Sequence, residues 1–305
     1  MSLVEMALKK MRDAARGGAD GAQPAEGAPR AARSPIVVGE VLERSGTYRV
    51  LPPPDPARRY NPDKVVHIDQ GALCAAGLLA PEHQQRELTD QYRQVKRPLI
   101  AAAIGRGVPK IERGQAIMMA SAMAGEGKTF TAINLALSIS MERDVSVLLV
   151  DADVPKPHIS RTFGVAKEIG LLDVLRDEGM DAESAILPTD RPNLSLLPAG
   201  QRSETATELL ASHRMEEVIR RLVDADPNRI VIIDSPPLLL TTESRALAHS
   251  VGQVVIVVRA DVTPQEAVLD AISYIGEGKP ISLVLNQCKQ TTPGYYYGYG
   301  EATSA

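Results

Sequence analysis

Six short runs of aliphatic residues between residues 116 and 285 are apolar at consecutive positions. Strands that helices cover on both faces have this pattern, because both sets of alternating side chains are buried. Stretches with helical spacing of apolar residues separate the runs. The sequence therefore predicts an α/β fold over residues 82–290, with a mostly parallel sheet and helices on both of its faces. The predicted strands are residues 116–120, 145–150, 194–197, 230–233, 254–258 and 281–285.

The pattern differs on either side of this predicted domain. Residues 1–16 combine an apolar side and a charged side at helical spacing, which fits either a docking helix or a solvated helix. Residues 17–35 are rich in Ala, Gly and Pro and predict a disordered linker. Residues 36–81 carry short strand-like pieces and predict an extended lead-in. Residues 291–305 lack periodicity and predict a flexible tail.

Composition narrows the classes of function. The 305 residues include 34 Lys and Arg and 38 Asp and Glu, so no overall positive field would attract nucleic acid. With 8 Tyr, 2 Phe and no Trp, modules that stack bases or sugars on rings are disfavoured. Cys74 and Cys288 lack a metal-ligand spacing and predict thiols in a reducing compartment. Because no run could span a membrane and no signal or myristoylation glycine begins the chain, we expect a cytoplasmic protein.

A glycine-rich turn lies between the first predicted strand and the helix that follows it. Residues 122–129 match the phosphate-loop pattern, with Ala in place of its first Gly. The glycines allow backbone N–H groups to approach phosphate oxygens, and Lys128 would reach the β- and γ-phosphates. The hydroxyl of Thr129 would bind Mg²⁺. The predicted nucleotide-binding residues of this segment are Gly125, Glu126, Gly127, Lys128, Thr129 and Phe130.

Two further predicted strands run into acidic residues. One ends at Asp151 and is followed by Asp153, and the other ends at Asp234. In a parallel sheet these carboxylates lie at the same edge as the phosphate loop. Asp151 and Asp234, together with Thr129, predict a Mg²⁺ site. Asp153 would reach the attacking group, although a helix cap or a turn residue after the strand is the alternative. We therefore predict Lys128, Asp151 and Asp153 as catalytic residues.

In these motifs the chain resembles the bacterial tyrosine kinases (BY-kinases), which are P-loop proteins unrelated to the eukaryotic-type kinases. The resemblance covers residues 82–299. It is greatest to the tyrosine autokinases that accompany exosortase-linked exopolysaccharide loci, through residues 1–5 and 91–99. The family landmarks, in order, are residues 121–129, 151–153, 170–175, 197–200, 208–210 and 233–237.

The resemblance implies an ATP- and Mg²⁺-dependent protein-tyrosine autokinase that regulates exopolysaccharide synthesis or export. It also implies a ring-like homo-oligomer, in which Asp90, Arg93 and Lys96 replace a Glu-Arg-Arg contact motif; a solvated helix face is the alternative. A membrane-embedded polysaccharide co-polymerase or chain-length partner would activate the kinase at the inner face of the cell membrane. Asn286 would contact adenine, unless it only forms a strand-end turn.

Two positions depart from the family pattern. Where the family has Arg after the acidic motif, this chain has Pro155 followed by Lys156, which leaves the function of that arginine in doubt. Ala124 replaces a frequent Pro in the phosphate loop. We expect this second change to be mild, because backbone groups bind the phosphates there.

Half of the tyrosines lie close together in the glycine-rich tail. Beside the kinase motifs they predict acceptors that a neighbouring subunit phosphorylates in trans, whereas alone they would fit a sticky or disordered terminus equally well. Each phosphate adds about −1.5 to −2 charge, so a phosphorylated tail should leave a carboxylate-lined site and loosen the ring. The predicted acceptors are Tyr295, Tyr296, Tyr297 and Tyr299.

Two other functions remain open at this point. One is a nucleotide-switched ATPase of the septum-positioning and chromosome-partition type, although such proteins have a signature Lys where this chain has Met123 and lack a tyrosine-rich end. The other is a weakly catalytic scaffold that binds nucleotide. GTP specificity is disfavoured, because residues 286–289 do not form the Asn-Lys-x-Asp guanine motif.

Overall fold

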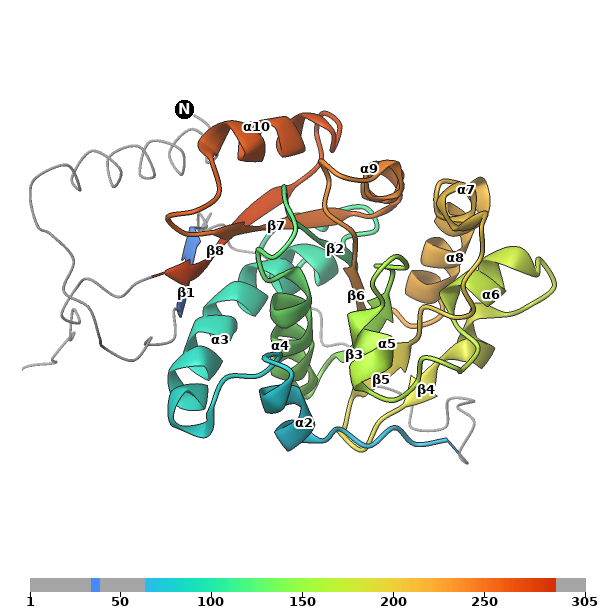
Figure 1. Cartoon of the computed structure of the whole chain (residues 1–305), viewed down its shortest axis with the longest axis horizontal. Coiled ribbons are helices and arrows are strands. Elements are labelled where there is room, and N and C mark those ends of the chain that lie inside the picture. Colours follow the sequence, from blue (N-terminus) through green and yellow to red (C-terminus); the bar gives the residue numbers. More distant parts are fainter. Residues whose placement is uncertain (1–33, 39–63, 289–305) are drawn as a thin grey trace, which may run out of the picture.

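The computed structural model describes residues 64–288 together with the backbone of a strand at residues 34–38 (Figure 1). The predicted helix of residues 1–16, the linker up to residue 33 and the tyrosine-rich tail lie outside the described residues. Neither Cys74 nor Cys288 forms a disulfide within the described part of the chain.

A mixed eight-stranded sheet forms the centre of the fold, in the order β1-β8-β7-β2-β6-β3-β5-β4. The inner strands are parallel, and they are the six strands that the aliphatic runs predict. The strands β1 and β4 pair antiparallel at the two edges. The strands are β1 (Ser34–Val38), β2 (Ala116–Ala120), β3 (Ser146–Asp151), β4 (Leu187–Pro188), β5 (Leu194–Leu197), β6 (Arg229–Asp234), β7 (Gln253–Arg259) and β8 (Ile281–Cys288).

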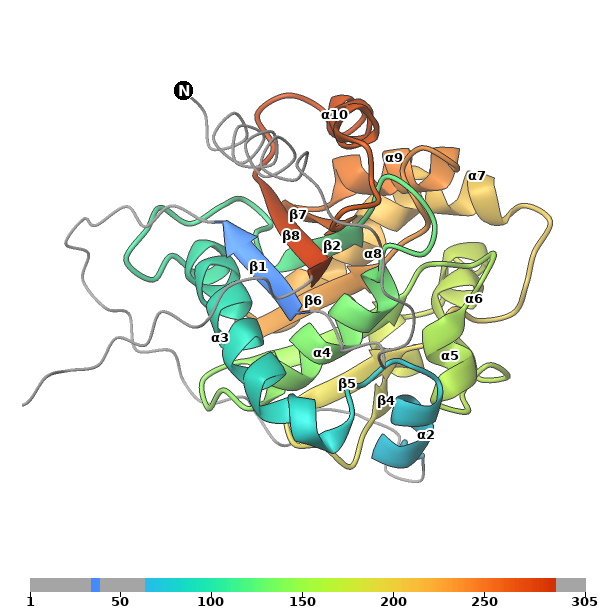
Figure 2. The same ribbon diagram turned by 60° about the vertical axis from the view of Figure 1, so that its left-hand side comes forward.

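Helices cover both faces of the sheet, as Figures 1 and 2 show from two directions. One face carries α2 (Gln70–Ala75), α3 (Glu82–Ile104), α4 (Lys128–Ser140) and α5 (His158–Thr162). The other carries α6 (Leu171–Arg176), the 3₁₀ helix η1 (Ala182–Ala185), α7 (Ala206–Leu210), α8 (His213–Asp224), α9 (Thr242–Ser250) and α10 (Gln265–Ser273). Among the described helices, none combines the length and the apolarity that crossing a membrane requires.

The alternation of side chains along the inner strands divides the core in two. In β2, Met118 packs into the cluster beneath α6 to α10, whereas Ile117 and Met119 pack into the cluster beneath α2 to α5. Because both faces of a strand need apolar residues in such a sandwich, the strands read as continuous aliphatic runs. The mostly parallel sheet and its two helix layers confirm the predicted fold class.

The end of the predicted lead-in is part of this core. Ile68 and Leu73 are buried, and the N–H of Val66 donates to the carbonyl of Pro188 at 2.8 Å. Asp69 caps α2 by accepting the N–H of Ala72 at 3.0 Å. The described part of residues 36–81 therefore belongs to the same folded body as the sheet, because its apolar side chains find partners there.

Candidate active site

The phosphate loop leaves the carboxyl end of β2 and enters α4. In the sheet, β3 lies on one side of β2, whereas β7 and β8 lie on the other side. Open α/β sheets bind ligands at such a point, where the strand order reverses direction. Gly125 and Gly127 have φ values of 80° and 94°, which favour glycine. A Cβ at Gly127 would also lie 2.1 Å from Nδ2 of Asn286. The loop therefore requires glycine at 127 for both conformation and space.

The side chain of Glu126 points back into the loop. It is 2% exposed, and its Oε2 accepts the N–H of Met123 at 2.6 Å. Its backbone carbonyl accepts Nδ2 of Asn286 at 3.0 Å. Asn286 lines the same cavity as the loop, but this amide nitrogen already holds the loop, so its adenine contact stays a prediction.

Two buried carboxylates lie beside the first turn of α4. Asp151 and Asp234 are register partners in β3 and β6, and both are 0% exposed. The Thr129 hydroxyl donates to Oδ2 of Asp234 at 2.7 Å. The backbone N–H and the hydroxyl of Ser160 donate to Oδ2 of Asp151 at 2.8 and 2.7 Å. The Oδ1 atoms of both carboxylates have no hydrogen-bond partner among the described residues.

This arrangement is electrostatically costly for the protein alone. Burial, together with the charge of Asp151, raises the pKa of Asp234 to about 8, although Lys128 opposes the shift. Burial also raises the pKa of Asp151 to about 6, in spite of the Ser160 hydrogen bonds. A bound cation would therefore stabilise the ionised pair.

The donor set suits Mg²⁺. Within the described residues, no cluster of three or more His, Cys, Asp or Glu side chains could hold a metal ion by itself. Mg²⁺ rarely needs such a cluster, because it keeps several waters and uses one or two carboxylates together with phosphate oxygens. The Thr129 hydroxyl and the unpaired oxygens of Asp151 and Asp234 supply donors of this kind.

A cavity of about 1110 Å³ opens beside the phosphate loop. Asp153, Lys156 and His158, from the connection between β3 and α5, line it together with Lys128 and Phe130. Its volume is slightly above the usual range for small-molecule sites, about 300–1,000 Å³. The cavity therefore has room beyond the phosphates of a nucleotide.

Asp153 both shapes its own loop and faces this cavity. Its Oδ1 accepts the N–H of Lys156 at 3.3 Å, which is the turn interaction that the sequence left as the alternative. Burial raises the pKa of its carboxyl group, against the opposing charge of Lys128. A carboxylate with a raised pKa is a better proton acceptor near neutral pH than an ordinary Asp.

The far wall of the cavity comes from the segment at residues 74–88, which sequence analysis did not assign to the site. Leu78, Leu79 and Leu88 give it an apolar surface. Asn134 of α4 fixes the wall by donating to the carbonyl of Leu78 at 2.9 Å. Local sequence does not identify this wall, because it depends on α2 and α3 folding back over α4.

The predicted subunit-contact residues have different environments. Arg93 and Asp90 are exposed on α3 and form an ion pair at 2.6 Å. Lys96 is only 4% exposed, and its ammonium group binds the carbonyl of Ser138 at 2.5 Å and Glu142 at 2.8 Å. Lys96 thus holds α3 against the end of α4, so it is not part of a solvated face. Asp90 and Arg93 remain accessible for a subunit contact.

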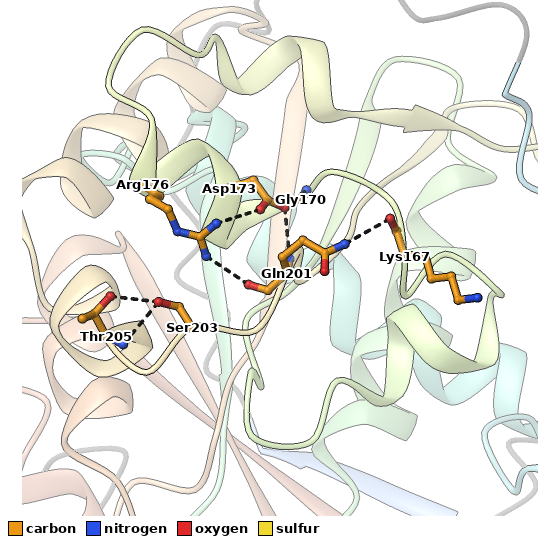
Figure 3. Close-up of polar contacts among 7 residues, drawn as sticks. All are labelled: Lys167, Gly170, Asp173, Arg176, Gln201, Ser203 and Thr205. Atoms are coloured by element: carbon orange, nitrogen blue, oxygen red, sulfur yellow. Dashed lines mark hydrogen bonds and ion pairs between the residues drawn. The ribbon is translucent and has the colours of Figure 1, made fainter.

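The loop after β5 is fixed by Asp173 of α6 (Figure 3). Its Oδ2 accepts the N–H groups of Gly170 at 3.0 Å and Gln201 at 3.1 Å. Arg176 contacts both Oδ1 of Asp173 and the carbonyl of Gln201 at 3.4 Å. The Gln201 side chain donates to the carbonyl of Lys167 at 3.3 Å. The N–H groups of Leu171 and Leu172 also donate to the carbonyls of Pro198 and Ala199 at 2.8 and 3.0 Å, so the two family landmarks at residues 170–175 and 197–200 form one hydrogen-bonded unit.

This unit also reaches the acidic motif. A Cβ at Gly170 would lie 2.2 Å from the carbonyl oxygen of Pro198, so the two landmarks pack backbone to backbone. Arg202, in the same loop, donates to the carbonyl of Pro155 at 2.9 Å. The guanidinium of Arg202 therefore binds the backbone at Pro155, the residue that stands where the resemblance implies an arginine. Sequence analysis assigned no function to Arg202, and only its long-range contact identifies it.

A family model described as an AAA domain matches residues 114–279. Tyrosine-protein kinase YwqD of Bacillus subtilis is 26% identical over 234 residues, which are 76% of this chain and 94% of that protein. Tyrosine-protein kinase wzc of Salmonella typhi is 31% identical over 188 residues, which are 61% of this chain and 26% of that protein. The chain thus spans nearly all of the first relative and about a quarter of the second.

Solved structures of kinase domains are also similar to this chain. The kinase domain of Escherichia coli tyrosine kinase ETK is 25% identical, with a TM-score of 0.59, and the match covers 70% of this chain and 80% of that one. The VpsO kinase domain, at 24% identity and a TM-score of 0.54, shares the fold and covers 68% of this chain and 100% of its own. Because the family model matches more than half of the chain, the chain belongs to the AAA domain family, and its sequence and fold are similar to those of the bacterial tyrosine kinases.

Proposed function

We propose that this protein is an ATP-dependent protein-tyrosine autokinase that phosphorylates its C-terminal tyrosine cluster. The observation that carries the proposal is the position of Asp153. This carboxylate lines the same cavity as Lys128 and the phosphate loop, and the cavity has room for an acceptor side chain. Phosphoryl transfer to a hydroxyl group requires a loop that binds the phosphates and a group that accepts the proton. Both line this cavity.

Each side chain has a distinct function in this proposal. Lys128 and the N–H groups at the start of α4 bind the phosphates of ATP. Thr129, Asp151 and Asp234 hold Mg²⁺, which neutralises charge on the phosphates when bound. Asp153 accepts the proton of the tyrosine hydroxyl as the phenolic oxygen bonds to the γ-phosphorus and the bond to the β-phosphate oxygen breaks, which releases ADP.

The two described tyrosines differ in how well their hydroxyl groups could accept a phosphoryl group. The described residues include Tyr92 and Tyr274. Tyr92 is 2% exposed, and burial raises its pKa, so its hydroxyl is a poor acceptor. Tyr274 is 39% exposed, and its ring lies under the guanidinium of Arg245 at 3.6 Å. Burial therefore argues against Tyr92 alone. We expect transfer to the predicted acceptors Tyr295, Tyr296, Tyr297 and Tyr299, because they cluster in a glycine-rich segment.

Replacement of Asp153 with Asn tests the proposal directly. We expect the Asp153→Asn protein to bind ATP and Mg²⁺ but to transfer phosphate about 10²-fold more slowly, because Asn cannot accept the proton. Phosphopeptide mapping of wild type and variant after incubation with ATP and Mg²⁺ measures both the rate and the sites. Hydrolysis of ATP by the wild type without any phosphotyrosine would contradict the proposal and favour the switch ATPase.

We further propose transfer between subunits of a ring-like homo-oligomer. The exposed Asp90 and Arg93 support a contact through α3, whereas Lys96 would act there only by fixing that helix. Four phosphates would add roughly −6 to −8 charge to a tail that must lie beside Asp153. We expect the dephosphorylated protein to be oligomeric and the phosphorylated protein to be smaller by mass photometry, and equal masses would exclude this regulation.

The cellular setting is also a proposal. Wzc and YwqD are named tyrosine-protein kinases, and the exopolysaccharide link comes from the resemblance of this chain to autokinases of exopolysaccharide loci. We propose that a membrane-embedded polysaccharide co-polymerase or chain-length protein holds this kinase at the inner face of the membrane and activates it. Co-purification of the chain with such a partner and faster phosphorylation in its presence would support this setting.

A further inference from the structure

The Glu126 side chain has hydrogen bonds on both of its oxygens. It lies between Gly125 and Gly127, in the loop that would surround a triphosphate. A negative side chain directed at the phosphates would repel them. Instead, Oε2 accepts the N–H of Met123 at 2.6 Å, and Oε1 accepts the hydroxyl of Thr263. The carboxylate is therefore turned away from the site and used inside the loop.

Thr263 connects this carboxylate to the end of β7, the strand that pairs with β2. It lies in the connection from β7 to α10, and its Oγ1 also accepts the N–H of Arg259 at 3.1 Å. Arg259 is the register partner of Asn286 in β8, and Asn286 donates to the carbonyl of Glu126. The loop is thus held from the β7 and β8 side by Glu126, while Thr129 and Asp234 hold it from the β6 side.

We infer that Thr263 is a positioning residue for nucleotide binding, which it influences through Glu126. The inference rests on the proposed binding of ATP by the phosphate loop. Thr263 does not line the cavity, so any effect on nucleotide affinity must pass through the loop. The Thr263 hydroxyl accepts the N–H of Arg259 at the end of β7 and donates to Oε1 of Glu126. Loss of this hydroxyl would leave Oε1 of the buried Glu126 without a hydrogen-bond donor.

The test compares Thr263→Val, which keeps the shape and loses the hydroxyl, with Thr263→Ser, which keeps the hydroxyl. A fluorescent N-methylanthraniloyl-ATP with Mg²⁺ measures the nucleotide Kd on the full chain. We expect Val to weaken binding about 5- to 20-fold and Ser to stay within about 2-fold of wild type, since 1.4 kcal/mol is a factor of ten. We also expect Val to raise the KM for ATP more than it lowers kcat.

Thermal melting separates this effect from general destabilisation. Equal nucleotide affinities for the Val and Ser variants would overturn the inference, as would a Val variant whose Kd changes only in proportion to lost folded protein. If Thr263→Val does not fold, Thr263→Ala replaces it, because Ala also lacks the hydroxyl that donates to Glu126. The Kd is measured without phosphate transfer, so nucleotide binding with no phosphotyrosine would contradict the proposed kinase function and leave this result intact.

Discussion

Lys128→Met is expected to lower tyrosine phosphorylation about 10³-fold, the effect of removing a preorganised positive group from the transferred phosphoryl group. Lys128 is buried at the start of α4 and lines the cavity with Asp153. Met has nearly the same length, so packing is kept while the charge is lost. Phosphotyrosine immunoblotting of the purified protein over a time course with ATP and Mg²⁺ measures the rate.

A matched control and a mixing experiment sharpen this prediction. Lys167→Met makes the same change at an exposed side chain outside the cavity, and we expect it to leave the rate near wild type. If transfer occurs between chains, the Lys128→Met protein should become phosphorylated when it is mixed with an active protein whose four tail tyrosines are Phe. A Lys128→Met protein that phosphorylates itself at the wild-type rate would contradict the assigned function of this lysine.

Asp234→Asn is expected to have opposite effects on activity and stability. Transfer should fall about 10²- to 10³-fold, because Asn cannot neutralise a bound cation and loses electrostatic stabilisation at the phosphates. The nucleotide-free protein should melt about 2–8 °C higher, the shift that roughly 1–2 kcal/mol produces in a domain of this size. The reason is that Asn stays neutral, whereas Asp234 must either bind a proton on folding or keep a fully buried charge beside Asp151.

The raised pKa of Asp234 determines how the stability of the protein should change with pH. Asp234 has a folded-state pKa of about 8, above the ordinary value of 3.8, so the folded protein holds a proton that the unfolded chain releases. Its contribution therefore lowers stability progressively as pH rises from about 4 to about 8. Melting of the metal-free protein across this range should show a smaller decline for Asp234→Asn than for wild type.

The control for this comparison is Asp270→Asn, the same substitution at an exposed position of α10. It should change neither the melting temperature nor its pH dependence. Addition of Mg²⁺ and ATP should raise the melting temperature of the wild type more than that of Asp234→Asn, because ligand binding adds stability only where the site is complete. An Asp234→Asn protein that is less stable than wild type without ligand would show that this charge is well compensated.

The sheet was predictable because its determinants are local. Each inner strand is identified by consecutive aliphatic residues, such as those of β6 and β7, and the period of two sends alternate side chains to two helix layers. The edges were predictable only in part. The strand-like residues that begin at position 36 overlap β1, but β4 is two residues long. The antiparallel pairing of both edge strands depends on tertiary packing.

The residues of the candidate site also differ in whether local sequence predicts them. Gly127, Thr129, Asp151 and Asp234 were identified because backbone conformation, spacing and strand ends fix their positions. Local sequence did not identify the functions of side chains whose partners are far away in the chain. Lys96 has the charge of a solvated helix face, yet its partners, Ser138 and Glu142, are more than forty positions away, and they bury it.

By itself, the sequence determined the aliphatic sheet, the phosphate loop and the acidic strand ends, because each depends on residues within a few positions of one another. Only the tertiary structure decided which loops surround that site. The apolar wall at residues 74–88, the contact of Arg202 with Pro155 and the link from Thr263 to Glu126 each join segments far apart in the chain. Such contacts form only when whole helices and strands pack, so no local pattern encodes them.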